Sequence, residues 1–402
     1  MLVNSPHMPK NSIYLDNAAT TRVDERVLQA MIPGLSGEYG NASSLHHFGT
    51  KAKEILERSR YELAQCIGAG GDEVYFTSGG TESNNWALKG IAEANGHKGR
   101  HIIVSSIEHD CVLNTCNWLA SKGFFITYLP VDSDGIVDPE VLREAINPKT
   151  ILVSVMHANN EIGTIEPIRE IGLICKNHHV PFHSDACQSF GKIPVDVNGL
   201  NIDMLTINAH KIYGPKGIGA LYIRKGLNIF PLLHGGGQES GLRSTTENIP
   251  AIAGFTKAAE ICLQEMNSES DRLSRFREKI ARFIFSNYEN AYINGHPDQR
   301  LPGHLSFSFH GMEGETIRLL LLLDEMGIAV SAGSACSSND KSLSASHALQ
   351  AIGRNPFEAR GAIRISMGRF TNETDIDIFL ESFGQAINSL TSIFSESSVI
   401  NH

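Results

Sequence analysis

The stretch between residues 73 and 223 alternates short apolar runs, rich in β-branched residues, with longer helical patterns. Seven runs have the length and composition of buried strands: Glu73–Thr77, His101–Ser105, Phe124–Leu129, Ile151–Met156, Val180–Ser184, Asp203–Ile207 and Ile218–Ile223. Helical patterns lie between most of them: Glu82–Asn95, Cys111–Ser121, Pro139–Ile146 and Pro167–Asn177. This alternation predicts an α/β fold, with a mostly parallel, seven-stranded sheet that has helices on both faces.

The pattern changes after about residue 262, where an amphipathic helix is expected over Asp271–Glu289. Short strands at His304–Phe309 and Ala362–Ser366 and helices at Thr316–Glu325 and Asp375–Ile393 follow. We therefore expect a large domain of residues 16–262 and a smaller α+β domain of residues 1–15 and 263–402. The smaller domain contains a loop rich in small residues, 331–346, which includes Cys336.

Length and composition argue against a nucleic-acid-binding, membrane or secreted protein. A chain of 402 residues is long enough for two domains, and its net charge of −10 argues against direct binding to nucleic acid or to anionic membranes. The longest aliphatic run, Leu319–Leu323, is too short to cross a bilayer, and no N-terminal segment resembles a signal peptide. The seven cysteines are scattered and unpaired in spacing, so we expect reduced thiols in the cytoplasm. No metal site is expected: His178, His179 and His183 lie close together, but helical i,i+4 spacing between them would have to cross Pro181.

Open parallel sheets bind ligands at the carboxyl ends of their strands, and Lys211 follows one such end, Asp203–Ile207. Burial there would favour the neutral amine, which is a nucleophile toward aldehydes. The run from Gly79 to Glu82 follows the first strand and opens a helix, so its backbone N–H groups could bind a phosphate. Taken alone, the lysine is better explained as a surface residue and the glycines as an ordinary turn.

Three further polar residues follow predicted strands of the same sheet. His109 could stack on a planar ring or transfer protons, the amide of Asn160 could bind a ring hydroxyl, and Asp185 could pair with a protonated pyridine nitrogen. Each could equally be a helix cap, a polar turn or half of a salt bridge. Together with Lys211 and the anion site, however, they match the requirements of pyridoxal phosphate.

Eight motifs occur in order along nearly the whole chain: YLDNAATT at Tyr14–Thr21, GNASSLHHFG at Gly40–Gly49, FTSGGTESNN at Phe76–Asn85, HANNEIG at His157–Gly163, HSDACQSFGK at His183–Lys192, AHKIYGPKGIGALY at Ala209–Tyr222, SAGSAC at Ser331–Cys336 and IRISMGRFT at Ile363–Thr371. This set resembles the NifS/IscS-type cysteine desulfurases, which are fold-type I pyridoxal-phosphate enzymes. The resemblance implies a homodimer with an active site at each subunit interface. The chain departs from the family pattern at Asn208, where Ser or Thr is usual, and at Gly80, where alanine is common.

Carried over position by position, the resemblance implies a role for each motif residue. Lys211 would form the Schiff base, and Asp185 would pair with the ring nitrogen beneath a stacking His109. The phosphate would be held by Gly80, Thr81, Asn208 and His210, with Thr246 of the partner subunit. Asn160 and Gln188 would contact the ring hydroxyl. Arg364, with Asn160, would bind the substrate, because a guanidinium fork suits a carboxylate.

Cys336 favours one reaction among those of pyridoxal phosphate. A cysteine in a small-residue loop could be incidental, but beside such a cofactor site its thiolate could take sulfur from L-cysteine as a persulfide and leave L-alanine. We therefore expect a cysteine desulfurase that passes sulfur to an acceptor, either an iron–sulfur scaffold or an enzyme of thiolation or sulfur modification. A selenocysteine lyase, another pyridoxal-phosphate transferase and a non-catalytic sulfur-relay protein are the alternatives.

Overall fold

The computed structural model describes residues 12–332 and 345–399, with side chains as far as Leu390. Contacts divide the chain into two compact units. The larger consists of residues 20–160 and 164–267, and the smaller of residues 1–19, 161–163 and 268–402. The division falls inside one long helix, α7 (Ile249–Asn287).

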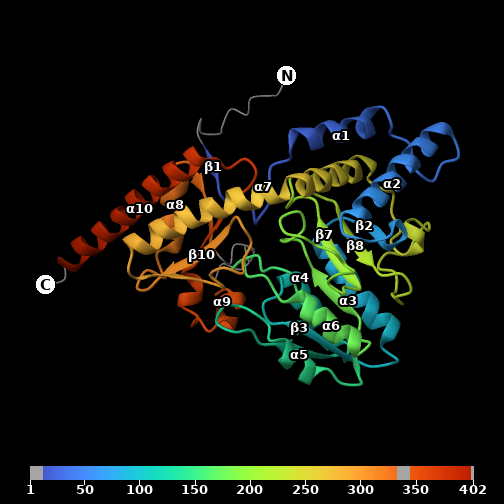
Figure 1. Cartoon of the computed structure of the whole chain (residues 1–402), viewed down its shortest axis with the longest axis horizontal. Helices are drawn as coiled ribbons and strands as arrows, with labels where there is room; N and C mark the ends of the chain where they lie inside the picture. Colours follow the sequence, from blue (N-terminus) through green and yellow to red (C-terminus); the bar gives the residue numbers. More distant parts are fainter. Residues whose placement is uncertain (1–11, 333–344, 400–402) are drawn as a thin grey trace. The chain divides into compact units, whose positions relative to one another are not determined.

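The larger unit contains a seven-stranded sheet whose order is β2-β8-β7-β6-β5-β3-β4 (Figure 1). Its strands are β2 (Val74–Thr77), β3 (His101–Ser105), β4 (Phe125–Leu129), β5 (Thr150–Ser154), β6 (Phe182–Asp185), β7 (Met204–Asn208) and β8 (Gly219–Ile223). Only β8 runs antiparallel to its neighbours; all the other described pairings in this sheet are parallel. The predicted α/β class, with seven mostly parallel strands, is confirmed.

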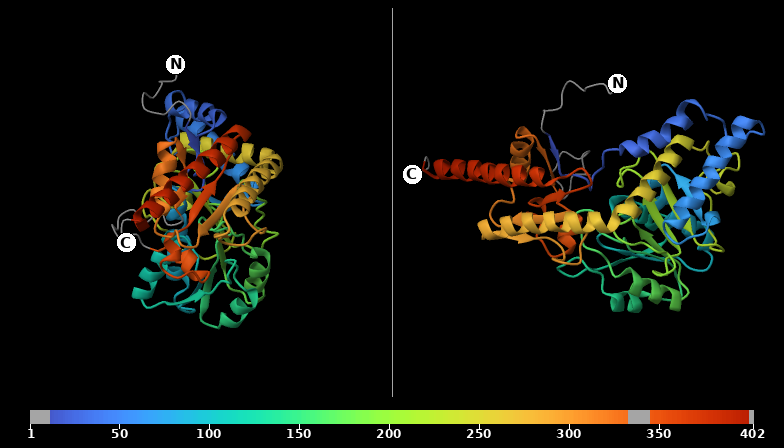
Figure 2. Two further views of the ribbon diagram at one scale, coloured as in Figure 1. Left: turned by 90° about the vertical axis from the view of Figure 1, so that its left-hand side faces the viewer. Right: turned by 45° about the horizontal axis from the view of Figure 1, so that its top comes forward.

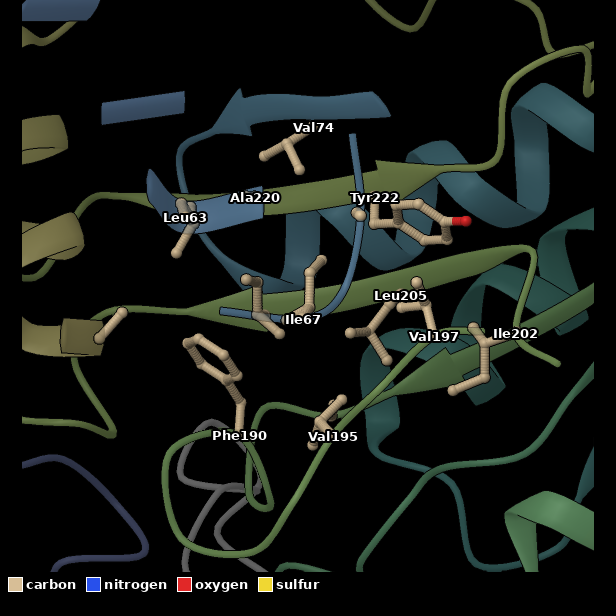
Figure 3. Close-up of a cluster of buried hydrophobic side chains, with 14 of the residues drawn as sticks. Leu63, Ile67, Val74, Phe190, Val195, Val197, Ile202, Leu205, Ala220 and Tyr222 are labelled. Carbon is tan, nitrogen blue, oxygen red and sulfur yellow. The ribbon is translucent and has the colours of Figure 1, made fainter. Parts of the chain in front are cut away.

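Alternating side chains of these strands serve two separate cores, because successive residues of a strand point to opposite faces. Leu205 and Tyr222 pack on one face with α2 and α6, as part of the cluster drawn in Figure 3. Met204 and Leu221 belong to the opposite core with α3 and α4. The helices of this unit, besides the first part of α7, are α1 (Glu25–Ser36), α2 (His47–Gln65), α3 (Gly80–Asn95), α4 (Asp110–Ser121), α5 (Pro139–Ala145) and α6 (Ile168–Asn177).

The smaller unit is built on a four-stranded sheet with the order β12-β13-β10-β9 and a short two-stranded pair, β1-β11. Its strands are β1 (Ile13–Tyr14), β9 (Ala291–Ile293), β10 (His304–Phe309), β11 (Ile328–Ala329), β12 (Ser331–Ala332) and β13 (Ile363–Ser366). Helices α8 (Thr316–Glu325) and α10 (Glu373–Val399) and the end of α7 pack against it in one apolar core (Figure 2); α9 (His347–Ala351) is a single short helix.

Within the described ranges, every helix falls short of the combination of length and apolar character that a bilayer-crossing segment needs.

Candidate active site

The direction of the strands brings five sequence-predicted positions to one edge of the large sheet. Because β8 is antiparallel to both β2 and β7, β2 points the same way as the parallel set β7, β6, β5 and β3. The carboxyl ends of these strands therefore share an edge. They lead respectively to Gly80, Lys211, Asp185, Asn160 and His109.

Helix α3 begins at this edge with an open N-terminus. Its N-cap, Gly79, has φ 151° and ψ −179°, a conformation that L-residues rarely adopt, and no side chain of the described residues caps the helix. The first N–H groups of an uncapped helix, together with its dipole, favour an anion. Gly80 lies against the turn after β6, since a Cβ there would stand 2.6 Å from Sγ of Cys187. A side chain at position 80 would therefore require the Cys187 thiol to shift.

Asp185, the last residue of β6, is only 5% exposed and has donors on both carboxylate oxygens. Asn84 Nδ2 donates to Oδ2 over 2.6 Å, and the backbone N–H of Cys187 donates to Oδ1 over 2.8 Å. Two donors from different elements fix the plane of this carboxylate. Burial and the charge of Asp185 raise the pKa of the neighbouring Cys187 thiol well above its ordinary value, so that thiol stays protonated at neutral pH.

His109 forms the N-cap of α4. Its Nδ1 accepts the backbone N–H of Cys111 over 3.1 Å and lies 3.1 Å from the thiol Sγ of the same residue. Because a backbone amide can only donate, Nδ1 acts as an acceptor and the ring proton is assigned to Nε2. The cap thereby fixes the orientation of a half-buried imidazole at the sheet edge.

The loop that carries His210 and Lys211 is held from the start of the chain. The backbone N–H and the hydroxyl of Thr21 both donate to the carbonyl of His210 over 2.9 Å, and the same hydroxyl accepts the N–H of Tyr213 over 2.8 Å. Lys211 is half-buried and lies near enough to Cys187 to affect its pKa. Burial and the nearby lysines, Lys211 first, lower the pKa of His210 to about 4, so its imidazole is neutral at pH 7.

The remaining sequence-predicted positions of this unit lie in different surroundings. Asn208, which ends β7, is 4% exposed, and its Oδ1 has no partner within the described part of the chain. Gln188 is 5% exposed, and its Oε1 accepts a hydrogen bond from Nζ of Lys192 over 3.4 Å. Asn160 is half-buried, and Thr246 is exposed in this chain.

These residues fit pyridoxal phosphate. The uncapped end of α3 and the neutral imidazole of His210 offer donors to a phosphate, and a buried carboxylate faces the same edge. Two buried amide oxygens, Oδ1 of Asn84 and Oδ1 of Asn208, lack hydrogen-bond partners among the described residues. Because buried polar atoms usually have hydrogen-bond partners, these two oxygens are available as acceptors for a polar ligand.

The last two sequence-predicted residues are Arg364 and Cys336. Arg364, on β13 of the smaller unit, is almost fully buried, with a side chain 3% exposed, and its Nη2 donates to Asp16 Oδ1 over 2.7 Å. The backbone of residues 15 to 18 runs along β13, where Ala18 and Asn17 bond to Ser366, which holds Asp16 beside the guanidinium. Cys336 lies outside the described residues.

Sequence reasoning missed three residues that support the site. They are Thr21, Asn84 and Glu108, whose contacts cross long stretches of chain. Glu108 Oε1 accepts the N–H of Met156 over 2.6 Å and the hydroxyl of Ser105 over 2.7 Å, which joins the turns after β3 and β5. Burial raises the pKa of Glu108 to about 8. Their position in the sequence was the only available signal: Thr21 and Asn84 lie inside two of the family motifs, and Glu108 directly precedes His109.

Known proteins match this chain over most of its length. The family model described as aminotransferase class-V matches residues 13–379. A cysteine desulfurase IscS of Dictyoglomus turgidum is 50% identical over 385 residues, which are 96% of this chain and 96% of that protein. A solved NifS-like protein superimposes with a TM-score of 0.87 at 40% identity, over 94% of this chain and all of that one. A structure of SspA in complex with cysteine has a TM-score of 0.78 at 40% identity, over 89% and 99% of the two chains. The chain therefore belongs to the class-V aminotransferase family and, within it, to the IscS-type cysteine desulfurases.

Proposed function

We propose that this pyridoxal-phosphate enzyme takes sulfur from L-cysteine, releases L-alanine and carries the sulfur as a persulfide on Cys336. The observation that carries the proposal is the gathering of Lys211, the buried Asp185 and the uncapped N-terminus of α3 at one edge of one sheet. A lysine, a carboxylate and an anion site are the three groups that the cofactor requires of its protein.

Each residue at the edge has a task in this account. Lys211 would hold the cofactor through its Nζ, and the same amine would take the proton from the substrate Cα. Asp185 pairs with the ring nitrogen, and His109 covers the ring. The phosphate is bound by Gly80, Thr81, Asn208 and His210. Asn160 and Gln188 contact the ring hydroxyl. When bound, the cofactor supplies an electron sink for bonds broken at the substrate Cα.

Sulfur transfer itself is assigned to Cys336 and substrate binding to Arg364. The thiolate of Cys336 attacks the sulfur of the substrate, so that a sulfur–sulfur bond forms while the carbon–sulfur bond breaks. The substrate Cβ takes up one proton where the carbon–sulfur bond broke, and Cα regains the proton that Lys211 removed, which gives L-alanine; the enzyme retains the persulfide. Arg364, with Asn160, binds the substrate carboxylate, as suits a buried guanidinium.

Assembly and the next step in sulfur transfer form part of the same proposal. The enzyme is a cytoplasmic homodimer in which Thr246 of the partner subunit completes each phosphate site. Residues 16–262 bind the cofactor, while residues 1–15 and 263–402 carry the cysteine loop. Persulfide sulfur passes to an acceptor protein, either an iron–sulfur scaffold or an enzyme of thiolation or sulfur modification.

Replacement of Cys336 by serine tests the proposal. The hydroxyl is almost wholly protonated at neutral pH and is a poor nucleophile toward sulfur, so alanine release from cysteine should fall to background. The visible absorbance of bound cofactor should remain, because no cofactor residue has changed. Intact-protein mass should show one extra sulfur on the native chain after cysteine is added, and none on Cys336→Ser.

The matched control is Cys66→Ser, at the C-cap of α2, which should form alanine at the native rate. Substantial alanine formation by Cys336→Ser would contradict the persulfide mechanism. A strong preference of the native enzyme for selenocysteine would instead favour the lyase reaction.

A further inference from the structure

Asn84 occupies a position in α3 that packing alone does not explain. It is only 1% exposed, and the residues three and four positions further along the helix, Ala87 and Leu88, are apolar and fully buried. Its Oδ1 has no hydrogen-bond partner within the described ranges. A buried amide with an unpaired oxygen costs free energy that an apolar side chain would avoid. The reason for an asparagine here must therefore lie outside the apolar core.

The amide nitrogen of Asn84 supplies that reason, because it contacts the carboxylate of Asp185. The distance from Nδ2 to Oδ2 is 2.6 Å, across 101 residues of sequence. The other carboxylate oxygen accepts the backbone N–H of Cys187. A donor from α3 and a donor from the turn after β6 thus hold the carboxylate from two sides, so it cannot rotate about its own bond without losing both contacts.

The same amide also reaches toward the imidazole at this edge. Its Nδ2 lies 3.2 Å from Sγ of Cys111, and that sulfur lies 3.1 Å from Nδ1 of His109. The side chain of Asn84 therefore contacts Asp185, which is assigned to the ring nitrogen, directly, and His109, which is assigned to the ring face, through one thiol. All four residues belong to the larger unit.

We infer that Asn84 is a positioning residue, which aims the carboxylate of Asp185 at the ring nitrogen and braces the imidazole of His109 through Cys111. The inference rests on the proposed function, since it assumes that the ring lies against these two groups. Asn84 itself does not touch the reacting atoms in this account. Its effect passes through the carboxylate, which keeps a proton on the ring nitrogen only while it is correctly placed.

The test measures that proton directly. Native enzyme, Asn84→Ala and Asn84→Thr are reconstituted with pyridoxal phosphate labelled with ¹⁵N in the ring, and the ¹⁵N chemical shift is recorded. Threonine nearly conserves the volume of asparagine, but its hydroxyl is too short to reach the carboxylate, so it serves if the alanine variant folds poorly. Asn85→Ala is the matched control, because the neighbouring amide on the same helix donates to the carbonyl of Thr81 instead.

We expect the native enzyme and Asn85→Ala to give the shift of a protonated nitrogen, and both Asn84 variants to move toward the unprotonated value. Alanine formation in the Asn84 variants should fall roughly tenfold to a hundredfold, because a hydrogen bond to a charged group is lost. In an Asp185→Asn background, Asn84→Ala should change the rate by less than about threefold, because the two residues act as one unit.

A purely structural role would lower the melting temperature of the Asn84 variants and leave the ¹⁵N shift at its native value, which would overturn the inference. If the losses of rate from Asn84→Ala and Asp185→Asn are additive in the double variant, the inference is likewise overturned. Failure of the proposed function would look different, because the native enzyme itself would then bind no cofactor or form no alanine.

Discussion

At the scale of single residues, the role of Asp185 can be separated from that of the phosphate site. Its carboxylate is held by Asn84 and by the backbone of Cys187, whereas His210 of the phosphate site follows β7 and is held by Thr21. Changing one group should therefore leave the other intact. Sequence position alone predicted Asp185, because it ends a buried strand. Its donor Asn84 could not be predicted, because that contact depends on how α3 packs.

Asp185→Asn should slow alanine formation by roughly two decades or more, because the ring nitrogen loses the negative charge that stabilises its proton. Cofactor should remain bound, since the phosphate contacts and Lys211 are unchanged. Single-turnover rates and the absorbance of bound cofactor measure the two effects. Asp196→Asn, at an exposed turn, is the control. A rate for Asp185→Asn close to the native rate would contradict the role of Asp185 as the partner of the ring nitrogen.

At the scale of elements, the seven strands of the large sheet could be predicted within a residue or two, because short apolar β-branched runs between helical patterns are typical of buried strands. The two-residue strands β1, β11 and β12 could not be predicted, because two residues are too few to show an alternation of apolar and polar side chains. Their pairing depends on partners far away in the sequence. Helix α7 begins at Ile249, well before the predicted Asp271, because its first part packs into the core of the larger unit.

The junction between α3 and β6 accounts for the glycine at position 80. A Cβ there would meet Cys187 Sγ at 2.6 Å, so Gly80→Ala should weaken cofactor binding by roughly tenfold through overpacking at the phosphate site. Adding Cys187→Ala removes the sulfur and should restore most of the loss. Titration of the apoenzyme with pyridoxal phosphate measures both variants. If the double variant binds as weakly as Gly80→Ala, the close approach of these two residues is not the cause.

At the scale of the whole molecule, buried ionisable groups set how stability depends on pH. Burial raises the pKa of Glu166 to about 8, while its Oε2 accepts the N–H of Val137. The folded chain therefore keeps this proton to a higher pH than the unfolded chain does. The resulting stabilisation is complete below the ordinary carboxyl pKa and is lost as pH rises through about 8.

Glu166→Gln keeps the acceptor and cannot ionise, so its free energy of unfolding should exceed that of the native chain increasingly as pH rises from about 5 to about 8. The difference should grow by at most about 1.4 kcal/mol per pH unit. Buried His157 and His183, with pKa values lowered to about 4 by burial, act with the opposite sign at lower pH and cancel in this comparison. Denaturant titrations of the native chain, Glu166→Gln and the exposed control Glu170→Gln measure it. Parallel curves for all three would contradict the assignment.

The proposed mechanism requires that the carboxyl edge of the large sheet bind pyridoxal phosphate through Lys211. Borohydride reduces the bond between a lysine and the cofactor aldehyde to a stable amine, and peptide mass mapping then identifies the lysine. Lys192 and Lys216 are the nearby competitors, since both help to lower the pKa of His210. We expect the label on the peptide that contains Lys211, with no covalent label in Lys211→Ala. Label on Lys192 or Lys216 in the native enzyme would contradict the account.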